Sequence, residues 1–157
     1  YLAAVDGVLF SSDMTELLYY PSAKADTTFV IPESVTSIGE YAFYNCNGLT
    51  SIEIPGSAAI IGELSFYRCY SLENVVISNG VTRISNYAFY DCNGVTTIVI
   101  PNSVTSIGDL ALVDCRSLTT IEFEGTIEQW NAISKGSNWN YATGKYTVHC
   151  TDGDITK

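Results

Sequence analysis

The sequence is poor in positive charge. It has 7 lysines and arginines against 17 aspartates and glutamates, which gives a formal net charge of −10 at pH 7. Proteins that bind nucleic acid or anionic lipid need a basic stripe facing the phosphates. We therefore expect no nucleic-acid partner and no adsorption to an acidic membrane surface.

Residues that carry chemistry are also scarce. His149 is the only histidine, and no serine or cysteine motif such as G-x-S-x-G accompanies it. The acidic residues are spread along the chain, whereas a glycosidase holds two of them at a fixed separation in a cleft. Cys-x-x-Cys and phosphate-binding glycine motifs do not occur, and Asp152-Gly153-Asp154 lacks the rest of a calcium loop. We expect a non-catalytic protein without metal or cofactor.

Long apolar runs are missing too. No stretch of 18 apolar residues occurs, so we expect no membrane insertion within this sequence. The chain opens at Tyr1 with no charged segment followed by an apolar one, which is the pattern of a secretion leader. We expect any signal or anchor to lie outside these residues.

What the sequence does have is a strict period of 23 residues. Such a period is typical of a solenoid, in which each unit buries its apolar side against its neighbours. Stacked units place equivalent residues about 4.8 Å apart with their side chains parallel, which favours a row of buried free thiols over disulfides. Four of the five cysteines mark the period: Cys46, Cys69, Cys92 and Cys115.

The apolar positions within each unit predict its local structure. Pairs such as Ile52/Ile54 alternate at period two, as short half-buried strands do, and Pro55 and Pro101 are expected to end two of the strands. The different spacing around Ala42-Phe43 predicts a short helical or 3₁₀ turn on the opposite side. We predict a solenoid with short parallel strands on a concave face and turns on the other side.

Two segments resemble the consensus of the BspA-like leucine-rich repeats, a family named for a bacterial surface antigen. They are VTSIGEYAFYNC at 35–46 and LTSIEIP at 49–55, and the resemblance extends over 31–122. It implies a leucine-rich-repeat solenoid in an extracellular or cell-surface bacterial protein. It further implies adhesion to a protein partner, such as a host extracellular-matrix or cell-surface protein. The sequence departs from the consensus at four positions: Ser65 for Ala, Leu112 for Phe, Ser78 for Pro and Ser85 for Gly.

Both ends of the chain are expected to cap the stack. We divide a single domain, 1–157, into an N-terminal hairpin and partial repeat (1–30), four repeats (31–122) and a C-terminal cap (123–157). Thr126 and Gln129 have capping-box spacing and predict a short helix, followed by a strand over 146–150. We expect Trp130 and Trp139 to pack within that cap.

The outward side of the strand ladder is the candidate binding surface. Residues between two buried ones point outward, and a constant register stacks them into columns. We expect partner contacts along two of these columns, although strand propensity alone would also favour such residues. The predicted contact residues are Val30, Glu53, Val76, Val99 and Glu122, with the flanking residues Thr28, Ser51, Asn74, Thr97 and Thr120.

A tyrosine column on the turn side is the second candidate surface. Tyr44, Tyr67 and Tyr90 recur with the repeat, and tyrosine suits both a sugar-binding surface and packing between coils. The predicted function is a non-catalytic recognition or adhesion module. The alternatives are a structural spacer that carries another domain and a carbohydrate-binding surface.

Overall fold

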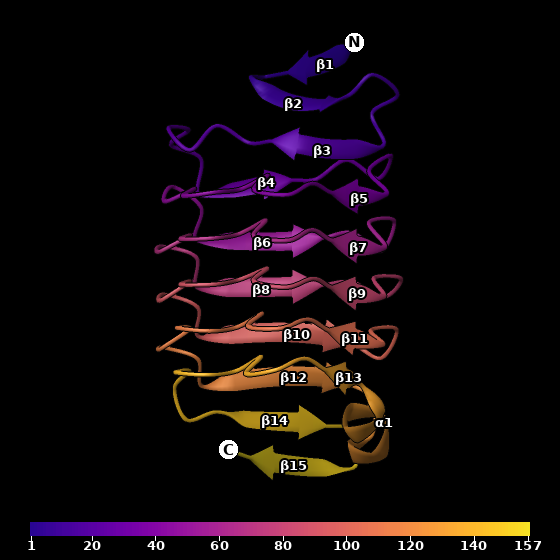
Figure 1. The fold of residues 1–157 in the computed structure, drawn as a ribbon, viewed down its shortest axis with the longest axis vertical. Coiled ribbons are helices and arrows are strands. Elements are labelled where there is room, and N and C mark those ends of the chain that lie inside the picture. The colour runs from indigo at the N-terminus through magenta and orange to yellow at the C-terminus, as the bar shows by residue number, and fades with distance from the viewer.

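The computed structural model describes residues 1–157 and shows coils stacked into a column, with the chain termini at opposite ends (Figure 1). Successive coils contribute strands to two sheets on different sides of the column. This confirms the predicted repeat solenoid. The long-strand sheet contains, in spatial order, β4 (Thr28–Val30), β6 (Ser51–Ile54), β8 (Asn74–Ile77), β10 (Thr97–Pro101), β12 (Thr120–Glu124), β14 (Thr147–Cys150) and β15 (Gly153–Thr156).

Apart from the strands of the N-terminal hairpin, the sequence does not predict the second sheet. Most of its strands have only two residues, which is too short for an alternation of buried and exposed side chains to be detected. From β3 to β13 its strands are parallel. This short-strand sheet contains, in spatial order, β1 (Leu2–Val5), β2 (Val8–Ser11), β3 (Glu16–Tyr19), β5 (Ser37–Ile38), β7 (Ile60–Ile61), β9 (Arg83–Ile84), β11 (Ser106–Ile107) and β13 (Ser134–Lys135).

A continuous apolar core runs through all the coils. The same position of successive coils supplies Phe43, Phe66 and Phe89, whose rings stack with centroids 4.7 and 5.0 Å apart. Leu112 takes this position in the next coil and is also buried. Each coil therefore buries its apolar side chains against its two neighbours, as expected of a solenoid.

The third side of each coil consists of successive tight turns. In the first full coil Tyr41 and Asn45 both have φ of 56°, in the left-handed region, so the backbone does not continue as a helix. The amide of Tyr44 donates within the coil to the Tyr41 carbonyl at 3.0 Å, and the amide of Phe43 donates to the Ser65 carbonyl of the next coil at 2.7 Å. These turns thus add backbone hydrogen bonds both within and between coils.

The N-terminal end is closed by antiparallel strands. β2 pairs with β3, and β1 adds a further strand to β2. Val8, Phe10 and Leu17 from this end are buried against the first coil. The hairpin thereby covers apolar residues that the first coil would otherwise expose.

The C-terminal end contains the only helix, α1 (Ile127–Ala132). Thr126 and Gln129 form its capping box, as predicted. Trp130 is buried, with its ring centroid 5.2 Å from that of Phe123 and 6.0 Å from that of Trp139. Gly153 begins β15, which pairs antiparallel with β14 and is a strand that the sequence does not predict.

Proline affects the two strands differently. β6 ends at Ile54, just before Pro55, as expected. β10 instead includes Pro101 as its last residue, in register with Glu124. At a strand end the missing amide hydrogen costs less than in the middle of a ladder, so the strand reaches one residue further than predicted.

Candidate recognition surface

The outward side of the long-strand sheet carries a column of residues in exact lateral register, which we call the central column. β4, β6, β8, β10 and β12 align Val30 with Glu53, Glu53 with Val76, Val76 with Val99, and Val99 with Glu122. All five predicted residues therefore lie side by side. Val30 is 87% exposed and Val76 37% exposed, and both valines present apolar surface to solvent.

The central column continues to His149, a residue of the predicted C-terminal cap. β14 pairs in parallel with β12 and aligns His149 with Glu122. The signal was present in the sequence, because Val148 is an inward strand residue and its neighbour must then point outward. The insertion of α1 between β12 and β14 breaks the 23-residue spacing and concealed this alignment.

The flanking column also lies in register and has free polar groups. Thr28, Ser51, Asn74, Thr97 and Thr120 align across the same strands, and Thr147 extends the series. The side chains of Thr28, Ser51, Asn74 and Thr97 make no hydrogen bond within the chain, whereas Thr120 lies 3.4 Å from the Thr119 hydroxyl. Four of the five predicted polar residues can thus bond to another molecule.

The neighbouring threonine column has a structural use. Thr50, Thr96 and Thr119 each direct the hydroxyl to the main-chain carbonyl of the preceding coil, at 3.2 to 3.3 Å. These hydroxyls therefore form hydrogen bonds between neighbouring coils and are not free to bind another molecule. Polar residues on this side of the sheet therefore serve two purposes: these three threonine hydroxyls bond one coil to the next, and four side chains of the flanking column keep their polar groups free.

Charge on the central column is concentrated at its acidic members. Glu53 accepts a hydrogen bond from the Ser78 hydroxyl at 3.2 Å. His149 Nδ1 lies 2.9 Å from Asp154 Oδ1, and this hydrogen bond raises the pKa of His149, with smaller contributions from the Asp154 and Glu122 charges. The surface is thus a mixture of three valines, two carboxylates and an imidazole.

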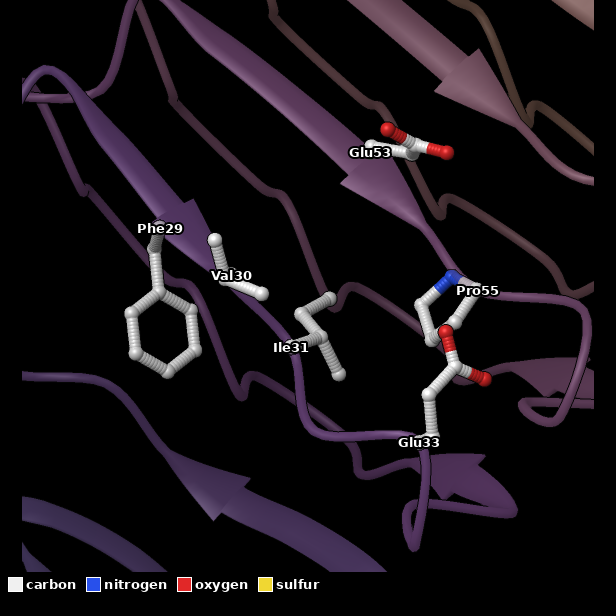
Figure 2. A pocket seen from close by; sticks show the side chains of 6 residues that line it. All are labelled: Phe29, Val30, Ile31, Glu33, Glu53 and Pro55. Atoms are coloured by element: carbon white, nitrogen blue, oxygen red, sulfur yellow. The ribbon is translucent and has the colours of Figure 1, made fainter.

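Shallow cavities lie at both ends of the central column. Near β4 a cavity of about 160 Å³ is lined by Phe29, Val30, Ile31, Glu33, Glu53 and Pro55 (Figure 2). Near β14 a cavity of about 460 Å³ is lined by Val99, Glu122, Phe123, Glu124, His149, Cys150 and Thr151. No group of three or more His, Cys, Asp or Glu side chains gathers in a way that could hold a metal ion.

The tyrosine column is packed against itself. The ring centroids of Tyr44 and Tyr67 are 5.5 Å apart and those of Tyr67 and Tyr90 are 5.3 Å apart, the latter pair stacked. The Arg68 guanidinium lies 4.9 Å from the Tyr67 ring centroid. Since each ring of this column lies against the next, this geometry favours lateral packing between coils over a flat platform for a sugar.

The repeat cysteines are buried, free thiols, as predicted. Their role is more than apolar filling, because the sulfurs of Cys69, Cys92 and Cys115 donate to carbonyls of the preceding coil at 3.0, 2.9 and 3.3 Å. Burial raises the pKa of Cys115 to about 12. Since the thiolate is the reactive form of cysteine, these residues are structural rather than nucleophilic.

No helix in the structure has the length and apolarity needed to cross a membrane.

Comparison with solved structures identifies similar leucine-rich repeat proteins from other bacteria. A leucine-rich cell-surface protein from Faecalibacterium prausnitzii is 33% identical, with a TM-score of 0.64, over 85% of this chain and 42% of that one. A leucine-rich repeat protein from Eubacterium ventriosum is 25% identical, with a TM-score of 0.74, over 87% of this chain and 39% of that one. This chain thus spans about two fifths of the length of these two proteins.

A shorter relative has a similar extent. A leucine-rich repeat protein from Bacteroides capillosus is 30% identical, with a TM-score of 0.66, over 79% of this chain and 99% of that one. Among curated proteins, no match was found.

Comparison with protein families is more specific about the repeat. The model of the BspA-type leucine-rich repeat region matches residues 19–134 as six copies. These copies extend on both sides of 31–122, from the last residue of β3 to the first residue of β13. The chain belongs to the BspA-type leucine-rich repeat family.

Proposed function

We propose that this chain is a non-catalytic recognition module of a bacterial cell-surface or secreted protein. It binds a protein partner through the central and flanking columns of the long-strand sheet. The Faecalibacterium relative, described as a cell-surface protein, supports the proposed location. A host extracellular-matrix or cell-surface protein is the proposed class of partner.

One observation carries this proposal: the central column joins exposed apolar and charged side chains in a single uninterrupted register. Val76 and Val99 are adjacent at its centre, with Glu53 on one side and Glu122 on the other. Apolar contact area surrounded by polar groups is the usual composition of a protein interface. The unused hydroxyl and amide groups of the flanking column add directional bonds beside it.

The test is a double substitution, Val76→Asp with Val99→Asp. Two carboxylates at the centre of an interface would be desolvated without a partner, so binding should weaken about tenfold or more. The wild-type protein is first screened by surface plasmon resonance against immobilised extracellular-matrix proteins and glycans. The double variant is then measured on the surface that binds, and circular dichroism checks its fold.

The matched control is Leu64→Asp with Leu110→Asp. It adds the same charge on the turn side, at left-handed positions that aspartate tolerates well. This control should retain binding. Equal binding by the wild type and the Val76/Val99 variant would refute the proposed surface, and a screen without any bound surface would favour the spacer role.

A further inference from the structure

The long-strand sheet has an unpaired edge at its N-terminal end. β4 is the terminal strand of that sheet and pairs only with β6. The antiparallel strands β1, β2 and β3 close the short-strand sheet instead, so they leave this edge uncovered by hydrogen bonds. Figure 1 shows these three strands beyond the first coil.

The main-chain groups on this edge can be identified from the parallel register. The Thr27 carbonyl accepts from the amides of Thr50 and Ser51, at 2.8 and 3.3 Å, so Thr27 faces β6. Main-chain groups of successive strand residues point to opposite sides, and Phe29 therefore also faces β6. Thr28 and Val30 face the open edge, where two amides and two carbonyls are available to another strand.

Two hollows lined in part by apolar side chains lie beside this edge. The 160 Å³ cavity of Figure 2 has Val30 and Phe29 in its lining. A second cavity of about 190 Å³ shares these two residues and separates β4 from the N-terminal hairpin. Val5, Asp6, Phe10, Met14 and Pro32 complete its lining. The 87% exposure of Val30 leaves a large apolar side chain between the two hollows.

The charge around the edge is negative. Asp6, Glu33 and Glu53 line the two cavities, and no lysine or arginine does. Lys24, which donates to the Asp6 carbonyl, is already paired with Asp26 at 3.2 Å. Figure 2 shows the Glu53 carboxylate above Pro55 and the Glu33 carboxylate below it; Glu33 follows the edge strand, whereas Pro55 follows β6.

We propose that the β4 edge binds an extended, basic segment of a partner protein as an additional strand of the long-strand sheet. Thr28 and Val30 supply the main-chain hydrogen bonds, the two hollows receive apolar side chains, and the three carboxylates attract lysine or arginine. Strand addition at an exposed edge is an established mode of peptide recognition. This inference rests on the proposed role in protein recognition and places one part of the partner at the N-terminal end of the central column.

The probe is an acetylated hexapeptide of alternating lysine and valine, titrated into the full chain and followed by NMR amide exchange. We expect the amides of Thr28 and Val30 to become protected while the Phe29 amide, already paired with β6, changes little. A glutamate–valine hexapeptide should bind more weakly, and a lysine–valine peptide interrupted by proline should not protect these amides.

Two variants test the chemistry of the site. Glu33→Gln with Glu53→Gln should weaken the lysine–valine peptide roughly threefold to tenfold, since exposed charge pairs contribute modestly. The control is Glu63→Gln with Glu73→Gln, which changes the net charge equally at other exposed positions. This control should bind the lysine–valine peptide as the wild type does. Val30→Pro removes an edge amide without touching the bonds to β6 and should abolish the protection of Thr28.

Several results would overturn strand addition. They are unprotected Thr28 and Val30 amides at saturating peptide, equal binding of the glutamate–valine peptide, and protection of these amides in the free protein that rises with protein concentration. The last would assign the edge to a second copy. The Val76/Val99 variant separates the two proposals. It should still bind the lysine–valine peptide but should no longer bind the protein partner. Loss of peptide binding would therefore count against strand addition alone, and retained partner binding would count against the central column alone.

Discussion

Single residues in this fold are governed by the column in which they lie. Ser65 occupies a fully buried position where the other repeats have Ala42, Ala88 and Ala111. Its hydroxyl has no hydrogen-bond partner. Burying a hydroxyl without a partner is destabilising, so this departure from the repeat consensus costs stability without an evident structural return.

We predict that Ser65→Ala raises the free energy of unfolding by about 1 kcal/mol. The substitution removes only the unpaired hydroxyl and reproduces the residue found in the neighbouring coils. Urea denaturation followed by circular dichroism measures the effect. The reciprocal control, Ala88→Ser, should destabilise by a similar amount, and a Ser65→Ala protein no more stable than the wild type would show that the hydroxyl is satisfied.

At the scale of elements, the sequence predicts what is periodic and misses what is short or irregular. The long strands were predictable because pairs such as Ile52/Ile54 alternate, and this alternation also assigned the five residues of the central column. The sequence does not predict the two-residue strands, because two residues are too few to show a period. It also does not predict β15 or the left-handed turns, because their local hydrogen bonds leave no apolar pattern in the sequence. His149 was missed because α1 interrupts the spacing.

The distance between neighbouring coils is set partly by residues without a side chain. A β-carbon built on Gly62 would lie 2.3 Å from the Ile38 carbonyl oxygen and 2.8 Å from the Gly39 carbonyl carbon, closer than β-carbons pack in proteins. Both neighbours are main-chain atoms of the preceding coil, so neither can rotate away. A β-carbon at this position would therefore require the two coils to move apart.

We predict that Gly62→Ala lowers the free energy of unfolding by about 1–3 kcal/mol because the two coils must move apart. Chemical denaturation checks the value. Ser85→Ala is the matched control, since Ser85 occupies the equivalent position one coil later and already carries a β-carbon; its effect should stay within about 0.5 kcal/mol. Similar costs for both substitutions would contradict this role of Gly62.

The β14–β15 hairpin is predicted to be sensitive to pH through His149. Since Asp154 raises the pKa of His149 in the folded chain, the stabilisation is complete below the ordinary value of 6.5 and is lost as the pH rises through the raised value. NMR titration should give His149 a pKa above 6.5, and Asp154→Asn should lower it. The melting temperature of the wild type should exceed that of Asp154→Asn most below pH 6.5; a difference that is independent of pH would contradict the linkage.

At the scale of the whole molecule, the solenoid is a nearly one-dimensional array. Each coil contacts only its neighbours, and the aromatic stack of Phe43, Phe66 and Phe89 shows this arrangement in the core. Stability in such an array is close to a sum of unit and interface contributions. Damage at one coil should therefore spread over a limited distance.

We predict that Phe66→Ala, which removes a ring stacked on both faces, lowers the free energy of unfolding by about 3–5 kcal/mol. Hydrogen exchange should show the loss of protection concentrated in β6, β7, β8 and β9, with β12 and β14 less affected. Phe66→Leu is the milder control, because Leu112 already fills this position in another coil. A uniform loss of protection along the chain would indicate a single cooperative unit instead.

The constant register between β4 and β12 also bears on how such a protein changes over generations. An in-frame duplication or loss of one 23-residue unit would lengthen or shorten the column by one strand spacing, about 4.8 Å, and keep every outward residue outward. An insertion of a single residue within a strand would turn its inward side chains to solvent. The length of the column can therefore change by whole units while the outward residues of each unit stay on the exposed face. The length of the binding surface and the identity of its side chains can thus evolve independently.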